Sequence, residues 1–344
     1  MNRAQLGDEF AVSTPRSRWK TFVLEAHDNG DADSLIAEAF GRANVSTTDD
    51  VHLHRIAFDE PIYVDSLDGR FWSVHTKAPT SAVAPQLKSI VESWRELDWM
   101  WLPSDHLRDI WPGARPFGVT ADFNDRGLAR STKGRSDLTV KARGELAEPA
   151  IEFLANQFGS AAAVSSVGLE ATSEDWGSIA EAVSRDGRFV AHGEDFGFHQ
   201  AIVQRVIGRY RRFVESVERA ALRWVALPEG GARLEGAPIV LRFGRRIPDV
   251  ELFVDHLFSA REPFRLWGIP QMTGEDTAQI EAVDLHVGQQ LRFDVAPGWM
   301  RVYLFDGGCG NSIARLVSNL QHHFDGTVAI VDEGLDAGIR QTAS

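Results

Sequence analysis

The spacing of hydrophobic residues changes along the chain, and the first half alternates between two patterns. Alternating or continuous apolar runs, which are typical of strands, occur at 19–26, 51–58, 62–65, 70–75, 98–102 and 117–123. Residues 34–43 and 82–97 instead have apolar positions three and four apart, which predicts amphipathic helices between these strands. The alternation predicts a mixed α/β fold for this half.

The second half contains one long helix and a strand-rich end. Shorter elements come first, with helices predicted at 148–157 and 174–184 and strands at 161–170 and 188–192. A continuous apolar stripe then predicts a long amphipathic helix at 198–225, which Pro228 and the glycines of 227–237 bring to an end. Alternating runs at 280–287, 291–295 and 300–305 predict an antiparallel meander, followed by a helix at 313–324.

A chain of 344 residues is expected to form two domains. Residues 1–18 are predicted to be a flexible tail. Residues 124–147 are polar and contain glycine, so they are predicted to be a basic linker or loop. This places an α/β domain at 19–123 and a second, α+β domain at 148–344.

The composition is that of a soluble globular protein. Hydrophobic residues make up 43% of the chain, and ten Trp and twenty Phe exclude a disordered class. No apolar run approaches the ~20 residues that span a bilayer, so no membrane association is predicted. A single cysteine and an N-terminus without an apolar leader predict a cytoplasmic location.

The formal net charge of −13 excludes binding to nucleic acid through overall charge. Any such binding needs a local basic surface. Lysine occurs only at 20, 77, 88, 133 and 141, so arginine carries most of the positive charge. The chain has no G-x-x-x-x-G-K-[ST] motif, which excludes a P-loop nucleotide site.

Five arginines form a row along the predicted long helix. They are Arg205, Arg209, Arg212, Arg219 and Arg223. At a rise of about 1.5 Å per residue the row is roughly 27 Å long. It could follow the phosphates of a nucleic acid or meet an acidic protein partner, and the alternative is an ordinary solvated face.

A second basic feature lies in the predicted loop, where residues 126–143 contain one acidic residue, Asp137. The basic residues are Arg126, Arg130, Lys133, Arg135, Lys141 and Arg143. Such a loop could hold a nucleic-acid backbone, or it could simply be polar and mobile. It lacks interleaved aromatic residues, which disfavours readout of single strands. The binding hypothesis gains most if both basic features share one face.

A glycine-rich turn precedes the last predicted helix. Its residues are Asp306, Gly307, Gly308, Cys309, Gly310, Asn311 and Ser312. Free N–H groups at a helix start can bind an anion, and a cysteine there could have a lowered pKa and act as a nucleophile. His286 is the nearby candidate base for Cys309. The alternative is an ordinary turn in which Asn311 or Ser312 caps the helix.

Oxygen-rich side chains follow the first strand. They are Glu25, Asp28, Asp31 and Asp33, with His27 among them. Such a cluster could hold Mg²⁺ or Ca²⁺, whereas Asp31 or Asp33 could instead cap the next helix. Asp284 and His286 lie two positions apart on a predicted strand and could join a hydrolytic site.

Two further patterns are rejected. Arg70 and His75 have the spacing of a helical RNase motif, but on a strand their side chains point to opposite faces. Trp99, Trp101 and Trp111 are best explained as core packing.

The basic features favour a cytosolic protein that recognises a polyanion, most plainly a nucleic acid, as a non-catalytic subunit of a larger assembly. No cofactor is predicted for this role. The first alternative is a metal-dependent hydrolase or nuclease that uses Asp, His and Glu residues, with Mg²⁺ as a candidate cofactor. Convergence of three or more of these residues in one pocket would favour it. The second alternative is a protein–protein interaction module, as a homo-oligomer or with another protein.

Overall fold

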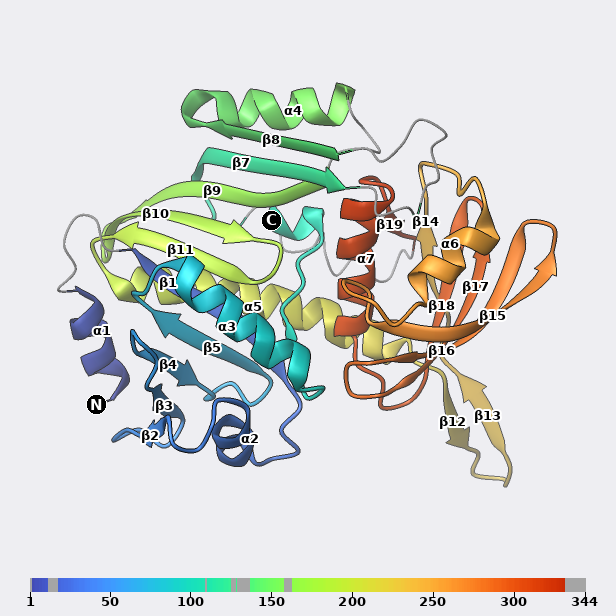
Figure 1. Cartoon of the computed structure of the whole chain (residues 1–344), viewed down its shortest axis with the longest axis horizontal. Helices are drawn as coiled ribbons and strands as arrows, with labels where there is room; N and C mark the ends of the chain where they lie inside the picture. Colours follow the sequence, from blue (N-terminus) through green and yellow to red (C-terminus); the bar gives the residue numbers. More distant parts are fainter. Residues whose placement is uncertain are drawn as a thin grey trace.

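The computed structural model describes residues 2–11, 18–108, 110–124, 128, 137–157 and 163–331. Two antiparallel β-sheets lie next to each other, and helix α7 (Asn311–His323) stands between them (Figure 1). The predicted mixed α/β class is confirmed, with a long helix in the middle of the chain and a C-terminal meander followed by a helix. Among the described residues, no helix is long and apolar enough to cross a membrane.

The larger sheet has eleven strands, which come from residues 19–193. Its order is β2-β3-β4-β5-β1-β11-β10-β9-β7-β8, with β6 paired to the end of β1. The strands are β1 (Trp19–Ala26), β2 (Val45–Thr47), β3 (Leu53–Ile56), β4 (Ile62–Asp65), β5 (Phe71–Thr76), β6 (Leu97–Trp99), β7 (Arg115–Asn124), β8 (Asp137–Arg143), β9 (Ala163–Ser173), β10 (Gly177–Ser184) and β11 (Arg188–Gly193). The predicted boundary at 124–147 therefore falls inside one sheet, because β9 pairs with β7 and β11 with β1.

Helix α5 (Phe196–Arg219) covers one face of this sheet and forms the centre of its core (Figure 1). Its stripe includes Ile202, Val206, Tyr210 and Val214, all at most 1% exposed. Burial of such a stripe, at about 1.5–3 kcal/mol per large apolar side chain, fixes the helix to the sheet.

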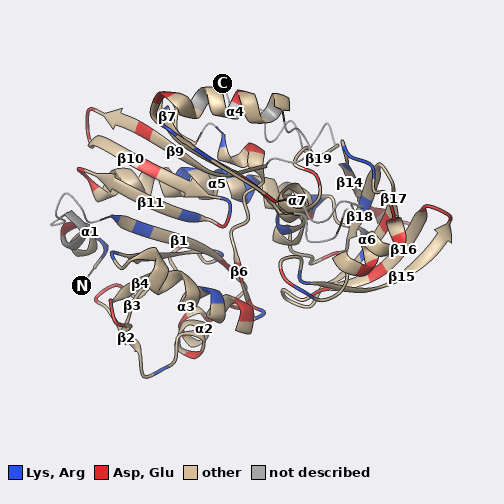
Figure 2. Cartoon of the chain, turned by 45° about the horizontal axis from the view of Figure 1, so that its top comes forward, with Lys and Arg blue, Asp and Glu red and all other residues tan. Residues whose placement is uncertain are grey.

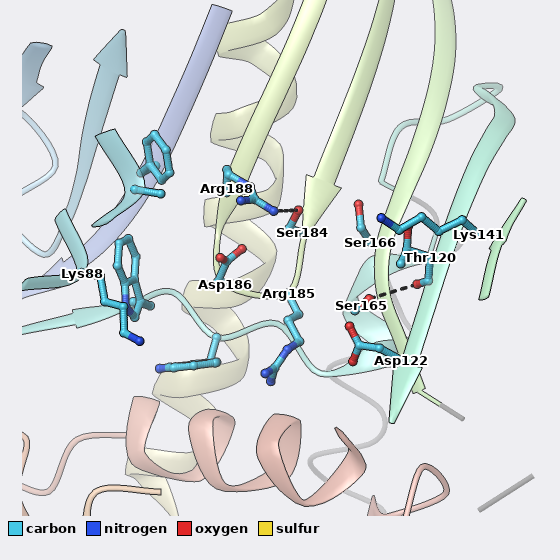
Figure 3. Close-up of a pocket in the computed structure, with 14 residues that line it drawn as sticks. Lys88, Thr120, Asp122, Lys141, Ser165, Ser166, Ser184, Arg185, Asp186 and Arg188 are labelled. Carbon is cyan, nitrogen blue, oxygen red and sulfur yellow. Dashed lines mark hydrogen bonds between the residues drawn. The ribbon is translucent and has the colours of Figure 1, made fainter. Parts of the chain in front are cut away.

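Two helices cover part of the opposite face. They are α2 (Ala32–Ala39) and α3 (Thr80–Ser93), which pack on the β1, β4 and β5 side chains. Over β7–β11 the same face carries small and polar side chains that line an open groove (Figure 3). Helix α4 (Ala147–Gln157) contacts β7 at the far end of the sheet.

The smaller sheet has the order β15-β16-β17-β18-β14-β19. Its strands are β14 (Ile239–Arg242), β15 (Leu266–Gly274), β16 (Thr277–Asp284), β17 (Gln290–Ala296), β18 (Trp299–Leu304) and β19 (Ala329–Ile330), and α6 (Val250–Leu257) packs against it. Every residue of α7 is buried, including its polar ones. This burial makes α7 the element that joins the two sheets.

One predicted element is wrong, and two segments predicted to be irregular contain regular structure. Residues 174–184, predicted as a helix, form a turn and strand β10, because Ile179, Glu181 and Val183 alternate inward against α5 while the alanines between them face the groove. The predicted loop contains β8, which pairs along β7. The predicted tail contains α1 (Arg3–Ala11), which buries Leu6 and pairs Arg3 with Asp50 and Asp65.

The long helix also ends earlier than predicted. It stops at Arg219, and β12 (Arg223–Ala226) follows, paired with β13 (Ala232–Glu235) in a projecting hairpin. Arg223 therefore lies outside the helical row and pairs with Glu235 at 3.6 Å.

Candidate metal centre

The end of β1 places two polar side chains between the sheets. Glu25 is fully buried on the α5 side of β1, and His27 follows just beyond the strand. The Nε2 atom of His27 lies 3.8 Å from Oε1 of Glu25 and has no hydrogen-bond partner among the described residues. The strand is held between β5 and β11, so both groups sit on a rigid element.

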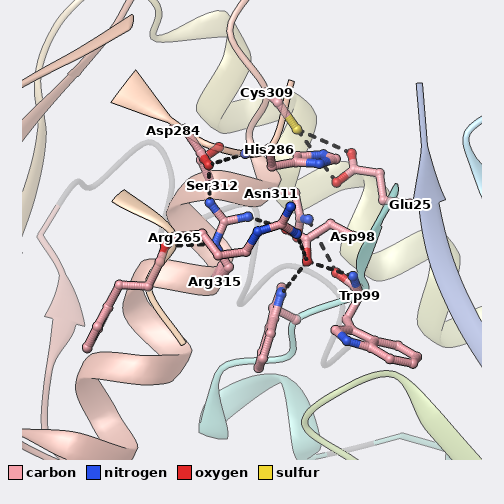
Figure 4. Close-up of polar contacts among 12 residues, drawn as sticks. Glu25, Asp98, Trp99, Arg265, Asp284, His286, Cys309, Asn311, Ser312 and Arg315 are labelled. Carbon is pink, nitrogen blue, oxygen red and sulfur yellow. Dashed lines mark hydrogen bonds and ion pairs between the residues drawn. The ribbon is translucent and has the colours of Figure 1, made fainter. Parts of the chain in front are cut away.

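His286 reaches the same place from the smaller sheet. It lies in the turn after β16, where its N–H donates to Oδ1 of Asp284 at 2.8 Å. The Asp284 carboxylate accepts from Arg315, whose guanidinium also donates to Asp98 (Figure 4). His286 has no exposed surface, and within the described chain neither of its ring nitrogens has a hydrogen-bond partner. A buried polar ring without partners is costly unless something binds it.

Cys309 comes from the glycine-rich turn between β18 and α7. The side-chain amide of Gln289 holds this turn, since its Oε1 accepts from the Cys309 N–H and its Nε2 donates to Oγ of Ser312 at 2.7 Å. The thiol points at Glu25, with Sγ 3.6 Å from each carboxylate oxygen (Figure 4). Contacts with residues of both sheets therefore fix the orientation of the thiol.

These four side chains converge on one point. One ligand atom from each of Glu25, His27, His286 and Cys309 lies within 4.8 Å of all the others. Ligand atoms around a tetrahedral zinc ion are separated by about 3.5 Å, so a small contraction brings the set to coordination distance. Two imidazoles, one thiolate and one carboxylate suit a borderline ion of the zinc class better than the Mg²⁺ considered for an all-oxygen cluster.

Arg70 and Glu218 form the edge of the cluster. Nε and a terminal nitrogen of Arg70 contact Oε1 of Glu25 at 2.6 and 2.5 Å, and its guanidinium also pairs with Glu218 of α5. A pocket of about 560 Å³ opens over them, and its lining includes His27, Asp28, Asp306 and Cys309. The cluster is therefore reachable through its His27 and Cys309 side.

Burial controls the protonation of the cluster. It raises the pKa of Glu25 to about 7 against the opposing effect of Arg70, and it lowers the pKa of His286 to about 4. Burial likewise lowers the pKa of His27. Both imidazoles are thus neutral at pH 7, the form in which a ring nitrogen can bind a metal.

Burial also corrects the prediction for Cys309. The thiol is 3% exposed, and burial raises its pKa well above the usual value instead of lowering it. A cysteine in this setting is inert as a free nucleophile, whereas metal coordination would deprotonate it. His286 lies next to Cys309 as predicted, but the two meet as members of one cluster.

The glycine-rich turn, predicted to bind an anion, already contacts the carboxylate of Glu218. The Gly310 N–H donates to Oε1 of Glu218 at 2.8 Å, and the Gly308 N–H donates to a backbone carbonyl within the turn. Gly307 lines the pocket mouth. Neither Asn311 nor Ser312 caps the helix, which begins after Gly310; Asn311 contacts Tyr210 and Trp99 instead.

The acidic cluster after β1 separates in the structure. Glu25 and His27 join the metal centre, and Asp28 lines its pocket. Asp31 caps α2 by accepting from Ser34 N–H at 3.0 Å, and Asp33 lies 3.3 Å from His54. Asp284 supports His286 from behind and is not in the set.

The arginine row is partly used inside the fold. Arg205 and Arg209 donate to the backbone carbonyls of Ile110 and Arg108, while Arg205, Arg212 and Arg219 are all exposed. In the predicted basic loop, Arg126, Arg130, Lys133 and Arg135 lie outside the described residues. Lys141 and Arg143 lie on β8 and line the groove on the side of the sheet opposite α5, so they do not share a face with the row. Figure 2 marks the Lys and Arg positions along the ribbon.

Sequence reasoning missed Arg70, Glu218 and Gln289 as parts of the site. The structure agrees with the rejection of Arg70 and His75 as an RNase motif, because His75 hydrogen-bonds Thr21 at 2.8 Å. The sequence gives no pairing between the strands predicted at 70–75 and 19–26, so no local signal pointed from Arg70 to Glu25.

Comparisons with known proteins identify the family of the chain. A family model described as MJECL33-like protein matches residues 2–337. The chain is similar to an uncharacterized protein of Methanocaldococcus jannaschii, MJECL33, with 25% identity over 375 residues that cover 97% of this chain and 91% of the relative. No solved structure matches.

Proposed function

Because the chain belongs to the MJECL33-like protein family, whose description names no reaction, we propose its function from geometry: a metal-dependent hydrolase. The observation that carries the proposal is the convergence of Glu25, His27 and Cys309 on a fully buried His286, whose ring nitrogens have no hydrogen-bond partner in the described part of the chain. These groups come from three distant parts of the sequence and two sheets. Structural packing alone gives no reason for two imidazoles, a thiol and a carboxylate to face one another.

In this proposal His27, His286 and Cys309 hold a zinc-class ion. Such an ion polarises a substrate oxygen and makes bound water a nucleophile near neutral pH. Arg70 fixes Oε1 of Glu25, so Oε2 is left facing the cluster as a proton acceptor. The substrate enters the pocket beside His27 and Cys309. Glu218 is paired with Arg70 there, and Asp28 and Asp306 leave the mouth acidic. That acidity favours a neutral or cationic substrate over an anionic one.

The hydrolase reading takes precedence over polyanion recognition by the long helix. Two members of the arginine row donate to backbone carbonyls, and a third lies on the projecting hairpin. A guanidinium that satisfies a carbonyl of its own chain has fewer N–H groups left for phosphate. The row therefore carries less weight than the converging ligand set.

The test is metal binding by matched histidine variants. The purified protein, stripped with a chelator and given Zn²⁺ or Co²⁺, should bind one ion, and cobalt should give a thiolate charge-transfer band. His286→Ala and Cys309→Ser should each weaken binding by at least roughly tenfold, and Cys309→Ser should abolish the band. His52→Ala, at an exposed histidine, is the control and should bind as the parent does.

A second variant separates binding from chemistry. Glu25→Gln should keep the ion but lose at least roughly a hundredfold in hydrolysis of a chromogenic ester, because it removes the proton acceptor. If the parent takes up no ion, or His286→Ala binds it equally well, the proposal is wrong.

A further inference from the structure

The uncovered face of the larger sheet forms a groove that the metal centre does not use. Two adjoining hollows of about 750 and 510 Å³ share Thr120, Lys141 and Ser166 and run across β8, β7, β9, β10 and β11 (Figure 3). At a strand spacing of about 4.8 Å, five neighbouring strands span roughly 19 Å. The floor consists of small residues, such as Gly118, Ala180 and Ala182, so a ligand can approach the backbone closely.

The lining of the groove is basic, although the chain as a whole is acidic. Six cationic side chains line the two hollows: Arg18, Lys88, Lys141, Arg143, Arg185 and Arg188. Two carboxylates accompany them, and one of these, Asp122, accepts from His322 at 2.6 Å. In a protein of net charge −13, such a concentration of positive charge on one concave face attracts an anionic partner.

Aromatic rings stand at both ends of the groove. Phe117 lies over Gly168, where a Cβ atom would meet the ring at 3.0 Å, and Trp99 lines the hollow next to α3. Both rings are partly buried and line the hollows. A cationic groove with aromatic rings in its lining is the arrangement by which proteins bind single-stranded nucleic acid, because bases stack on rings while the cations meet phosphates. An acidic peptide would use the charges but would leave the rings without a comparable partner.

We infer that this groove binds a single-stranded nucleic acid, through Lys141 and Arg143 on one wall and Lys88 and Arg188 on the other. The site is separate from the metal centre, since Phe22 faces the groove while Glu25, an odd number of positions along β1, faces α5. The inference does not rest on the proposed hydrolase. It places the nucleic-acid contact on the face opposite to the arginine row.

The experiment measures fluorescence anisotropy of labelled oligothymidylate and oligouridylate of about 20 nucleotides. Lys141→Glu/Arg143→Glu should weaken binding at least roughly tenfold and reduce the slope of log Kd against log salt by about 1.4, at about 0.7 per lost contact. Lys88→Glu, on the other wall, should weaken binding independently. Arg246→Glu/Arg261→Glu, at exposed arginines near the smaller sheet, makes the same charge change and should bind as the parent does.

Further variants and ligands give the results that would overturn the inference. Arg212→Glu/Arg219→Glu tests the helix row; loss of binding in that variant with normal binding in the groove variants would overturn the groove assignment. So would absence of oligonucleotide binding by the parent at low salt, or equal affinity for a poly-glutamate peptide, which would indicate an acidic protein partner. Unchanged thermal midpoints identify folded variants, and His286→Ala should bind the oligonucleotide normally.

Discussion

Arg315 is a charged side chain with no exposed surface, and its contacts explain how the metal centre is held in place. Its guanidinium donates to Asp98 and Asp284, and its Nε donates to the carbonyl of Phe264 at 3.1 Å. Asp284 in turn accepts from the His286 N–H. Burying three charges is tolerable because each is paired and hydrogen-bonded. The position of His286 therefore depends on a residue that touches neither the cluster nor its pocket.

Replacing Arg315 with Gln should strongly destabilise the protein. The change removes the cation that Asp284 and Asp98 share and leaves Asp98 with the more distant Arg265, at 3.9 Å. Loss of one partner of a buried ion pair typically costs about 3–5 kcal/mol of unfolding free energy. Urea denaturation measures the loss. Arg95→Gln, at a side chain that is 70% exposed and pairs only with its neighbour Glu96, should change stability by less than about 0.5 kcal/mol. Similar midpoints for the two variants would mean that the buried triad contributes little.

At the scale of elements, the crossing of α5 and α7 sets the geometry of the site. Gly310 lies against α5 so closely that a Cβ atom would stand 2.3 Å from the carbonyl oxygen of Val214. This approach brings Glu218 of α5 to the Gly310 N–H, and it places Cys309 over Glu25. Glycine is therefore required here for contact between helices, whereas sequence reasoning expected it to leave room for an anion.

Gly310→Ala should push the two helices apart. Overpacking of this kind costs typically about 1–3 kcal/mol, and it should also weaken metal binding because Cys309 moves with the turn. Gly298→Ala is the matched control, since a Cβ atom there would meet nothing within 4 Å. Thermal unfolding and cobalt binding, measured on both variants, check the prediction. If folded Gly310→Ala binds cobalt normally, the crossing of the two helices does not determine the geometry of the site.

Local patterns predicted elements well and the site only in pieces. Strand β1, the meander and α7 follow directly from periodicity, because their burial is regular. Residues 174–184 failed because alanines at alternate positions fit a helix as readily as a strand whose other face is open. Glu25 and His27 were singled out in one cluster and His286 as the candidate base for Cys309, and Glu25, His27 and His286 were among the residues whose convergence would favour a hydrolase. Nothing local indicates that β1, the turn after β16 and the turn before α7 meet, because that depends on how two sheets pack around α7.

At the scale of the whole molecule, buried neutral histidines make the fold sensitive to acid. Burial lowers the pKa of His75 to about 3, and burial with the nearby charge of Arg209 lowers that of His106 to about 3. In the unfolded chain a histidine titrates near 6.5. Above about pH 6.5 neither state takes up a proton at these sites. Below it only the unfolded chain does, so stability falls by up to about 1.4 kcal/mol per pH unit for each such group until the folded pKa is reached.

His106→Phe should reduce this acid sensitivity. The ring contact with Phe213, at 4.9 Å between centroids, is kept while the titrating group is removed. Urea unfolding between about pH 7.5 and 5 should then show a shallower decline of unfolding free energy than in the parent. A decline as steep as the parent's would show that His106 does not contribute.

The turn before α7 also has a consequence for the order of events in the cell. The four groups of the cluster belong to residues 25–27, 286 and 309, so translation must pass Cys309 before the last of them is available. No nascent fragment ending before Cys309 can hold the set. If the proposed centre binds a metal, loading must therefore wait until Cys309 has been made, and a chain truncated within the smaller sheet would lack part of the ligand set.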